Sequence, residues 1–242
     1  MALISKKIVM AALVLSLGVW SSAAKASLVN YTDVSSNGIV ISNIQEGNND
    51  DFAPGHYGQP VFVNGVLSFP SLQQFFVTAS GGTTSDSSTL VAKLSFTVTM
   101  PVATANLFTL NEGGFFAGYG GGAGSIVLGA VITDNGGNPI VGATGTVAPP
   151  IPFFAPLPSP QVLLDWTGTL NAVAPTALLT YTVHLDNDLT SSAPAQINYP
   201  TFAEVDKKTL AINFPNPGVP EPASLGVLVL GGAALITRRR RA

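Results

Sequence analysis

TLVAKLSFTVTM, residues 89–100, is the segment that decides the fold class. Its large apolar residues occupy every second position, and mostly polar or small residues lie between them. A period of two sustained over this length predicts a β-strand with one buried face and one mostly solvent-exposed face. Lys93 lies on the solvent-exposed face, as expected for a strand in an antiparallel sheet with one face in water.

Shorter strand-like segments lie on both sides of this one. Asn64-Gly65 and Asn135-Gly136 are hairpin turn signals between apolar runs. Residues 80–88 are expected to form a loop, and the glycine-rich residues 113–124 a loop or a thin, glycine-interrupted strand. The other predicted strands are residues 39–44, 74–79, 107–110, 125–132, 162–166, 177–185 and 208–214.

The composition supports an all-β domain. Charged residues make up only 10% of the chain, whereas it contains 25 glycines and 18 prolines. Eight to ten short strands separated by turn signals predict an antiparallel β-sandwich, jelly-roll-like, over residues 27–214. Residues 149–160, PPIPFFAPLPSP, hold six prolines and are expected to form an extended connector within that sandwich.

Charge and cysteine content exclude several functions. The formal net charge is −3, but the body between residues 27 and 220 carries −9, from three lysines and twelve acids, and has no arginine. Such a surface repels phosphate backbones, so we expect no nucleic-acid partner. The chain has no cysteine, which excludes disulfides, thiol catalysis and cysteine-based metal sites.

The first 26 residues read as a secretory signal peptide. Lys6 and Lys7 form a positive n-region, and residues 8–20 form an apolar h-region. Ala24 and Ala26 place small residues where signal peptidase requires them, which predicts cleavage before Ser27 and export of the mature protein.

The last 24 residues, 219–242, follow a Pro-rich linker at 215–218 and read as a membrane-inserted tail. An apolar run from Ala223 to Ile236 is followed by Arg238, Arg239, Arg240 and Arg241. The apolar run as a helix spans about 21 Å, short of the roughly 30 Å hydrocarbon core. A start near Val219 and snorkelling arginines close most of this gap and predict a transmembrane helix with a cytoplasmic C-terminus.

This tail resembles the PEP-CTERM sorting signal of Gram-negative and related environmental bacteria. Pro220, Glu221 and Pro222 match its motif, Ala223 and Ser224 continue it, and the arginine cluster matches its basic end. The resemblance implies that an exosortase cleaves the tail and passes the protein to the cell surface or extracellular polysaccharide. The inner-membrane anchor would then be transient.

Candidate chemical sites in the body are sparse. His56 and His184 are expected to be ordinary surface or rim residues, and no nucleophile-elbow motif accompanies them. The polar runs 186–188 and 48–51 have the oxygen ligands that Ca²⁺ takes, but neither has the spacing and late glutamate of an EF-hand loop, and turn chemistry is the preferred explanation. We therefore predict no catalytic residues, no metal and no cofactor.

The expected function is that of an exported, non-enzymatic protein of the cell surface or extracellular matrix. Its role would be structural or adhesive, in envelope or biofilm polysaccharide. One alternative is a carbohydrate-binding module using Tyr57, Tyr119 or Trp166, although Trp166 reads as a core residue. Another is a polysaccharide-acting hydrolase, which would need two carboxylates converging in one cleft.

Overall fold

The computed structural model describes residues 28–47, 55–72, 75–156 and 161–215. All regular structure in these ranges is β-strand, and every strand pairing is antiparallel, so the predicted all-β class is confirmed. The predicted signal peptide, nearly all of the linker, the sorting tail and the polar run 48–51 lie outside these ranges. Within them, no helix is long and apolar enough to cross a membrane.

Thirteen strands are assigned in the described ranges. In chain order they are β1 (Leu28–Asn30), β2 (Val34–Ser36), β3 (Ile39–Gly47), β4 (Val61–Val63), β5 (Val66–Ser68), β6 (Phe76–Gly81), β7 (Asp86–Tyr119), β8 (Ala123–Thr133), β9 (Pro139–Thr144), β10 (Thr146–Ala148), β11 (Phe153–Phe154), β12 (Val162–Ala193) and β13 (Thr201–Asn213).

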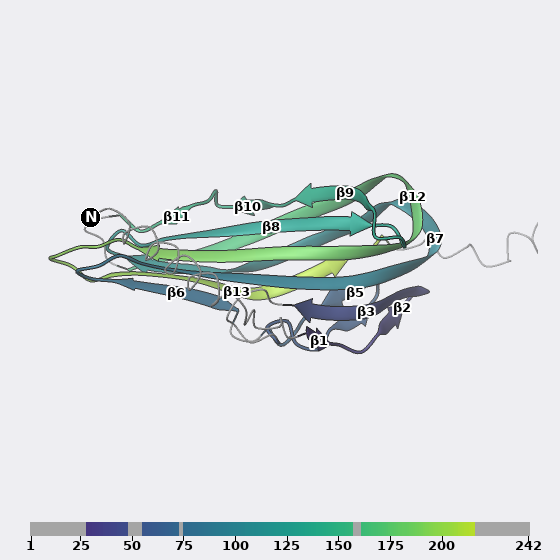
Figure 1. The fold of residues 1–242 in the computed structure, drawn as a ribbon, viewed down its shortest axis with the longest axis horizontal. Coiled ribbons are helices and arrows are strands. Elements are labelled where there is room, and N and C mark those ends of the chain that lie inside the picture. Colours follow the sequence, from purple (N-terminus) through teal and green to yellow (C-terminus); the bar gives the residue numbers. More distant parts are fainter. Residues whose placement is uncertain (1–27, 48–54, 73–74, 157–160, 216–242) are drawn as a thin grey trace, which may run out of the picture.

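Two very long strands, β7 and β12, form the frame of the molecule. They pair with each other along almost their whole length, and the pairing shifts register near the middle of both. Pro101 and Pro175 lie in this middle region, where a missing amide proton costs no ladder hydrogen bond. Both strands turn there at one end of the elongated molecule and run back (Figure 1).

The turn divides the hydrogen-bonded strands into two packed layers. In sheet I, residues 86–100 of β7 and 180–193 of β12 lie between β3 and β8. In sheet II, residues 104–119 of β7 and 162–173 of β12 lie between β13 and β10. The predicted β-sandwich fits this arrangement, with two strands that switch sheets through a bend.

The core lies between the two sheets. All the alternate apolar residues predicted to be buried in residues 89–100 are buried, and Tyr181, Val183 and Leu185 of β12 lie on the same inner face. A side chain at Gly168 of sheet II would meet Leu128 of sheet I, which shows how closely the sheets pack.

The hairpin predictions are confirmed. Asn64 and Gly65 have φ values of 52° and 79° and join β4 to β5, as a tight two-residue turn requires. Between β8 and β9, the Asp134 carboxylate accepts hydrogen bonds from the backbone N–H groups of Gly136 (2.8 Å) and Asn138 (2.9 Å).

Several predicted boundaries are wrong. The loop predicted at residues 80–88 is reduced to 82–85, because β6 and β7 extend into it. The strands predicted at 162–166 and 177–185 are parts of the single strand β12. Proline and small residues near 175 resemble a turn, but here they form a bend between two sheets.

The glycine-rich segment continues β7 as far as Tyr119, and only then does the chain turn. A Cβ atom at Gly114 would lie 1.8 Å from the Asp206 backbone oxygen, and one at Gly122 would lie 1.9 Å from that of Phe202. These glycines therefore allow β13 to approach closely, and the flexible-loop interpretation is wrong while the glycine-interrupted strand is confirmed.

The proline-rich connector is extended where it is described, with β11 pairing with the start of β8. The strand after it, β12, pairs with β7 and β8, which precede it. The strands on both sides of the connector thus belong to the same sandwich.

Candidate functional site

Two of the three aromatic residues considered for sugar binding are in the core. Trp166 is buried, as predicted, and its indole N–H donates to the Asp206 backbone oxygen at 3.2 Å. Tyr57 is also buried, and its hydroxyl accepts a hydrogen bond from the Asn187 side chain at 3.1 Å. Neither ring can stack on a sugar without unfolding the core.

The two histidines differ in exposure. His184 is exposed on the outer face of β12, as predicted. His56 is buried, contrary to the prediction, because the segment around it enters the sandwich next to β3. Its backbone N–H donates to the buried Glu46 carboxylate at 2.8 Å, and its ring meets the Phe75 ring edge-on.

Residues 186–188 do not form the loop that a calcium site would need. They continue β12, so Asn187 points into the core while its two neighbours point outward. Across the described part of the chain, no three His, Cys, Asp or Glu side chains are grouped so as to hold a metal ion.

A groove of about 560 Å³ lies on the outer face of sheet I. Its floor holds two cross-strand pairs, Lys93 opposite Asp186 and Ser95 opposite His184. Its sides come from β1 and β3 on one side and from β9 on the other. Gly129 is part of the floor, and its lack of a side chain helps to keep the groove open.

The groove brings together the residue types of a hydrolytic triad. Among the described residues, however, no hydrogen bond joins Ser95 to His184 or His184 to Asp186. A nucleophile needs a base within hydrogen-bond reach and a third group that orients the base. Ser95 in the groove is therefore not held against a base as an activated nucleophile would be.

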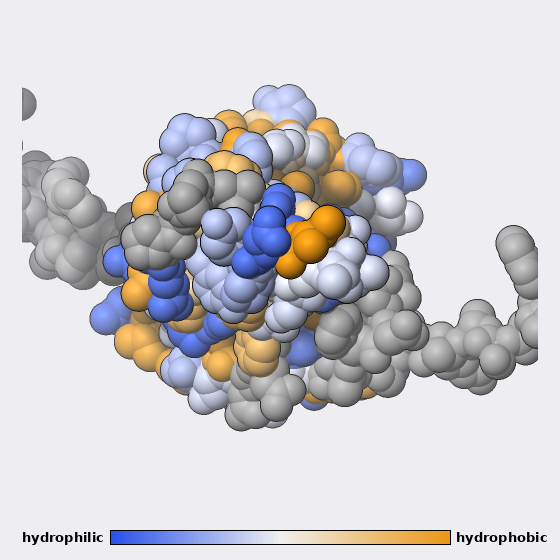
Figure 2. All heavy atoms as spheres, turned by 90° about the vertical axis from the view of Figure 1, so that its left-hand side faces the viewer, coloured by the Kyte–Doolittle hydropathy of each residue, from blue (hydrophilic) through white to orange (hydrophobic). Residues whose placement is uncertain are grey.

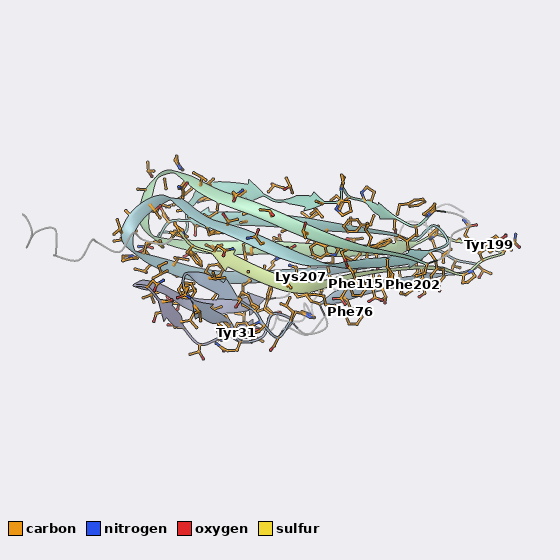
Figure 3. The ribbon with its side chains drawn as sticks, turned by 180° about the vertical axis from the view of Figure 1, so that it is seen from behind. Tyr31, Phe76, Phe115, Tyr199, Phe202 and Lys207 are labelled. Atoms are coloured by element: carbon orange, nitrogen blue, oxygen red, sulfur yellow. The ribbon has the colours of Figure 1, made fainter. Side chains whose placement is uncertain are left out.

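Four aromatic residues gather on the outer side of sheet II, and we call them the aromatic face: Phe76 of β6, Phe115 and Tyr119 of β7, and Phe202 of β13. Phe76 is 43% exposed, and the other three are half-buried. The Tyr119 and Phe202 rings stack with centroids 5.5 Å apart. Figure 3 shows Phe76, Phe115 and Phe202 near one another, with Tyr199 further along the same side.

Strand register places these rings in two rows. In one row, Asp206 lies between Phe76 and Phe115, and Asp165 follows Phe115 on the next strand. In the other, Phe202 pairs with Tyr119. Residues four apart on one strand are about 13 Å apart, so more than one sugar ring fits between the rows.

Acidic side chains lie among these rings. Asp206 forms an ion pair with Lys208, whose ammonium group lies 5.2 Å from the centre of the Phe115 ring. Partial burial, together with the charge of Asp206, raises the pKa of the Glu204 carboxyl. Asp206 itself is buried, so the accessible hydrogen-bond acceptors beside the flat apolar rings are the carboxylates of Glu204 and Asp165.

The end of the molecule beyond Tyr119 and Phe202 exposes apolar residues as well, among them Ile197 and Tyr199. Figure 2 views this end and shows hydrophobic areas, one of them compact and near the centre, among hydrophilic residues.

Comparisons with known proteins give little further guidance. No protein-family profile and no curated protein sequence matches the chain. The enzymatically active domain of tailspike protein 4 from bacteriophage CBA120 aligns with 59% of this chain and 20% of its own, at 10% identity and a TM-score of 0.21. A chain of infectious bursal disease virus, Gx strain, aligns with 75% of this chain and 51% of its own, at 11% identity and a TM-score of 0.17. These scores are too low to carry an argument about function.

Sequence reasoning found only Tyr119 of the aromatic face. Phe115 lies in the glycine-rich segment that is predicted to be a loop or a glycine-interrupted strand, and this ambiguity gave no basis for placing its side chain on a binding face. The four aromatic residues come from three strands distant in sequence, and only the pairing of β13 with β6 and β7 unites them.

Proposed function

We propose that this protein is an exported, non-enzymatic surface or matrix protein that binds neutral polysaccharide through the aromatic face. The observation that carries the proposal is the set of four rings interspersed with carboxylates on the outer side of sheet II. Sugar rings have apolar C–H faces and polar edges. They can stack on Phe and Tyr while their hydroxyls donate to the carboxylates.

The charge of the body supports a neutral polymer rather than an anionic one. The net charge of −9 between residues 27 and 220 would repel polymers rich in carboxylate, sulfate or phosphate. Lys208, whose ammonium group lies over the Phe115 ring, is already paired with Asp206.

Delivery to the surface is the second part of the proposal and rests on the sequence of the two termini. The signal peptide would direct export, and the tail, with its Pro220-Glu221-Pro222 motif and arginine cluster, would be recognised by an exosortase. The described chain reaches Pro215 just before this tail.

Binding is tested with the purified protein and the polysaccharide extracted from the producing cells. Phe115→Ala with Phe202→Ala removes one ring from each row, and we expect affinity to fall about tenfold or more. Circular dichroism and unfolding curves establish that the variant remains folded.

Two matched variants locate the binding site. Val127→Ala removes an exposed apolar side chain from sheet I, and Gly142→Leu fills the groove at a position where the nearest atom is 3.9 Å from the new Cβ. Both should bind like the wild type. Loss of binding in Gly142→Leu, with the aromatic variant unaffected, would assign recognition to the groove instead.

Sorting is tested by the mass of the C-terminal peptide from protein isolated from cells. We expect the mature protein to lack Arg238–Arg241, and Glu221→Ala to keep the full-length form in the inner membrane. A mature protein that extends to Ala242 would contradict exosortase processing.

A further inference from the structure

Glu112 of β7 and Lys207 of β13 meet inside the sandwich. Both side chains are completely buried, and the Lys207 ammonium nitrogen contacts the Glu112 carboxylate oxygen Oε2. The Phe75 ring covers the nitrogen, with its centre 4.7 Å away. Figure 3 shows the position of Lys207 along β13.

The surroundings provide few hydrogen bonds that would stabilise this contact as an ion pair. Among the described residues, no other protein group forms a hydrogen bond with Glu112 Oε1 or Lys207 Nζ. A buried ion pair offsets its desolvation only when further hydrogen bonds satisfy the remaining polar atoms. The site therefore disfavours two charges.

Burial shifts both groups toward their uncharged forms. Burial raises the pKa of the Glu112 carboxyl and lowers the pKa of the Lys207 ammonium, although each charge partly opposes the shift of the other. A neutral amine held against a neutral carboxylic acid is the reactant pair for amide formation. Fixed contact between the two groups replaces an encounter in solution, which can be worth a large effective concentration.

We propose that Lys207 and Glu112 become joined by an intramolecular isopeptide bond between Nζ and Cδ. The Lys207 nitrogen attacks the Glu112 carboxyl carbon, and the bond from that carbon to its hydroxyl breaks. A proton from the nitrogen leaves with the hydroxyl as water, so no oxidant, reductant or cofactor is required. The product has one N–H and one C=O in place of two charges.

The crosslink would connect β13 covalently to β7. It would close a loop of about 95 residues in the unfolded chain, and chain entropy then predicts a higher unfolding temperature, as for a disulfide over a loop of that length. The chain has no cysteine and therefore no disulfide to provide such a link. The inference is independent of the polysaccharide proposal, because it concerns the core alone.

The test is mass spectrometry of the purified wild-type protein under denaturing conditions. Between Lys93 and Lys207 the chain has no lysine or arginine, so trypsin should release residues 94–207 when Lys207 is free. We expect that cleavage after Lys207 fails, that trypsin instead releases residues 94–208, and that this fragment is lighter than its sequence mass by one water. Fragmentation after chymotrypsin digestion should show the peptides of Glu112 and Lys207 joined.

Two variants control for other losses of water. Lys207→Met and Glu112→Leu each remove one reacting group, and both should have their full sequence mass even if they fold poorly. Full mass in the folded wild type, with normal cleavage after Lys207, would overturn the proposal and leave a non-covalent pair. The same loss of water in both variants would also overturn it.

Discussion

At the scale of single residues, the core of this sandwich is unusually polar. Besides Glu112 and Lys207, it buries Glu46, which accepts hydrogen bonds from the Tyr31 hydroxyl and from the backbone N–H groups of His56 and Tyr57. These bonds fix the segment that inserts next to β3. Glu46 is thus supported by several donors, whereas Lys207 is the one polar partner of the Glu112 carboxylate in the part of the chain that the structure describes.

Replacing Glu112 should show how much the burial of Lys207 without its partner lowers the free energy of unfolding. In Glu112→Leu, the unfolded chain protonates Lys207 up to its ordinary pKa of 10.5, whereas burial keeps the folded pKa lower. Between the two pKa values the folded state binds fewer protons, so its stability should increase as pH rises from the lowered folded pKa toward 10.5. Urea unfolding at several pH values measures this dependence. Near neutral pH, the free energy of unfolding of Glu112→Leu should be about 3–5 kcal/mol lower than that of the wild type.

A double variant provides the control for this experiment. Glu112→Leu combined with Lys207→Met leaves no buried charge, so the rise of stability with pH should disappear. If Glu112→Leu alone shows no dependence on pH, Lys207 is not held in a desolvated site.

At the scale of elements, β7 shows what could be predicted from sequence. The alternation of residues 89–100 led directly to the strand, its buried face and the half-exposed Lys93. In the second half of the same strand, residues 107–110 were predicted as a strand, but the glycine-rich part left a loop and a glycine-interrupted strand both open, since a high glycine content is typical of loops. Here the glycines allow close approach between backbones, a requirement that depends on β13 and is invisible in the local sequence.

Glycine substitutions test this interpretation of β7 and its turn. Gly114→Ala and Gly122→Ala place a Cβ atom against backbone oxygens of β13, so each should destabilise the fold by about 1–3 kcal/mol or more. Gly129→Ala is the matched control, because its nearest neighbours are 3.8 Å away. Thermal unfolding compares the three. Equal stability of all three variants would contradict the role of Gly114 and Gly122.

At the scale of the whole molecule, the sequence predicted the class of fold but not how the strands are joined. The bends near Pro101 and Pro175 carry β7 and β12 from one sheet to the other, and this decides which faces lie outside. The aromatic face exists only because β6, β7 and β13 become neighbours in sheet II. Local patterns do not encode such long-range pairing, so the site could not be located from sequence.

The central claim is that the aromatic face retains an exported protein on polysaccharide. The most direct test measures, in the producing cells, the fraction of processed protein held in the surface or matrix layer. We expect the wild type and Val127→Ala to be retained there, whereas Phe115→Ala with Phe202→Ala should be exported, processed and released into the medium. Equal retention of the folded aromatic variant and the wild type would contradict the claim.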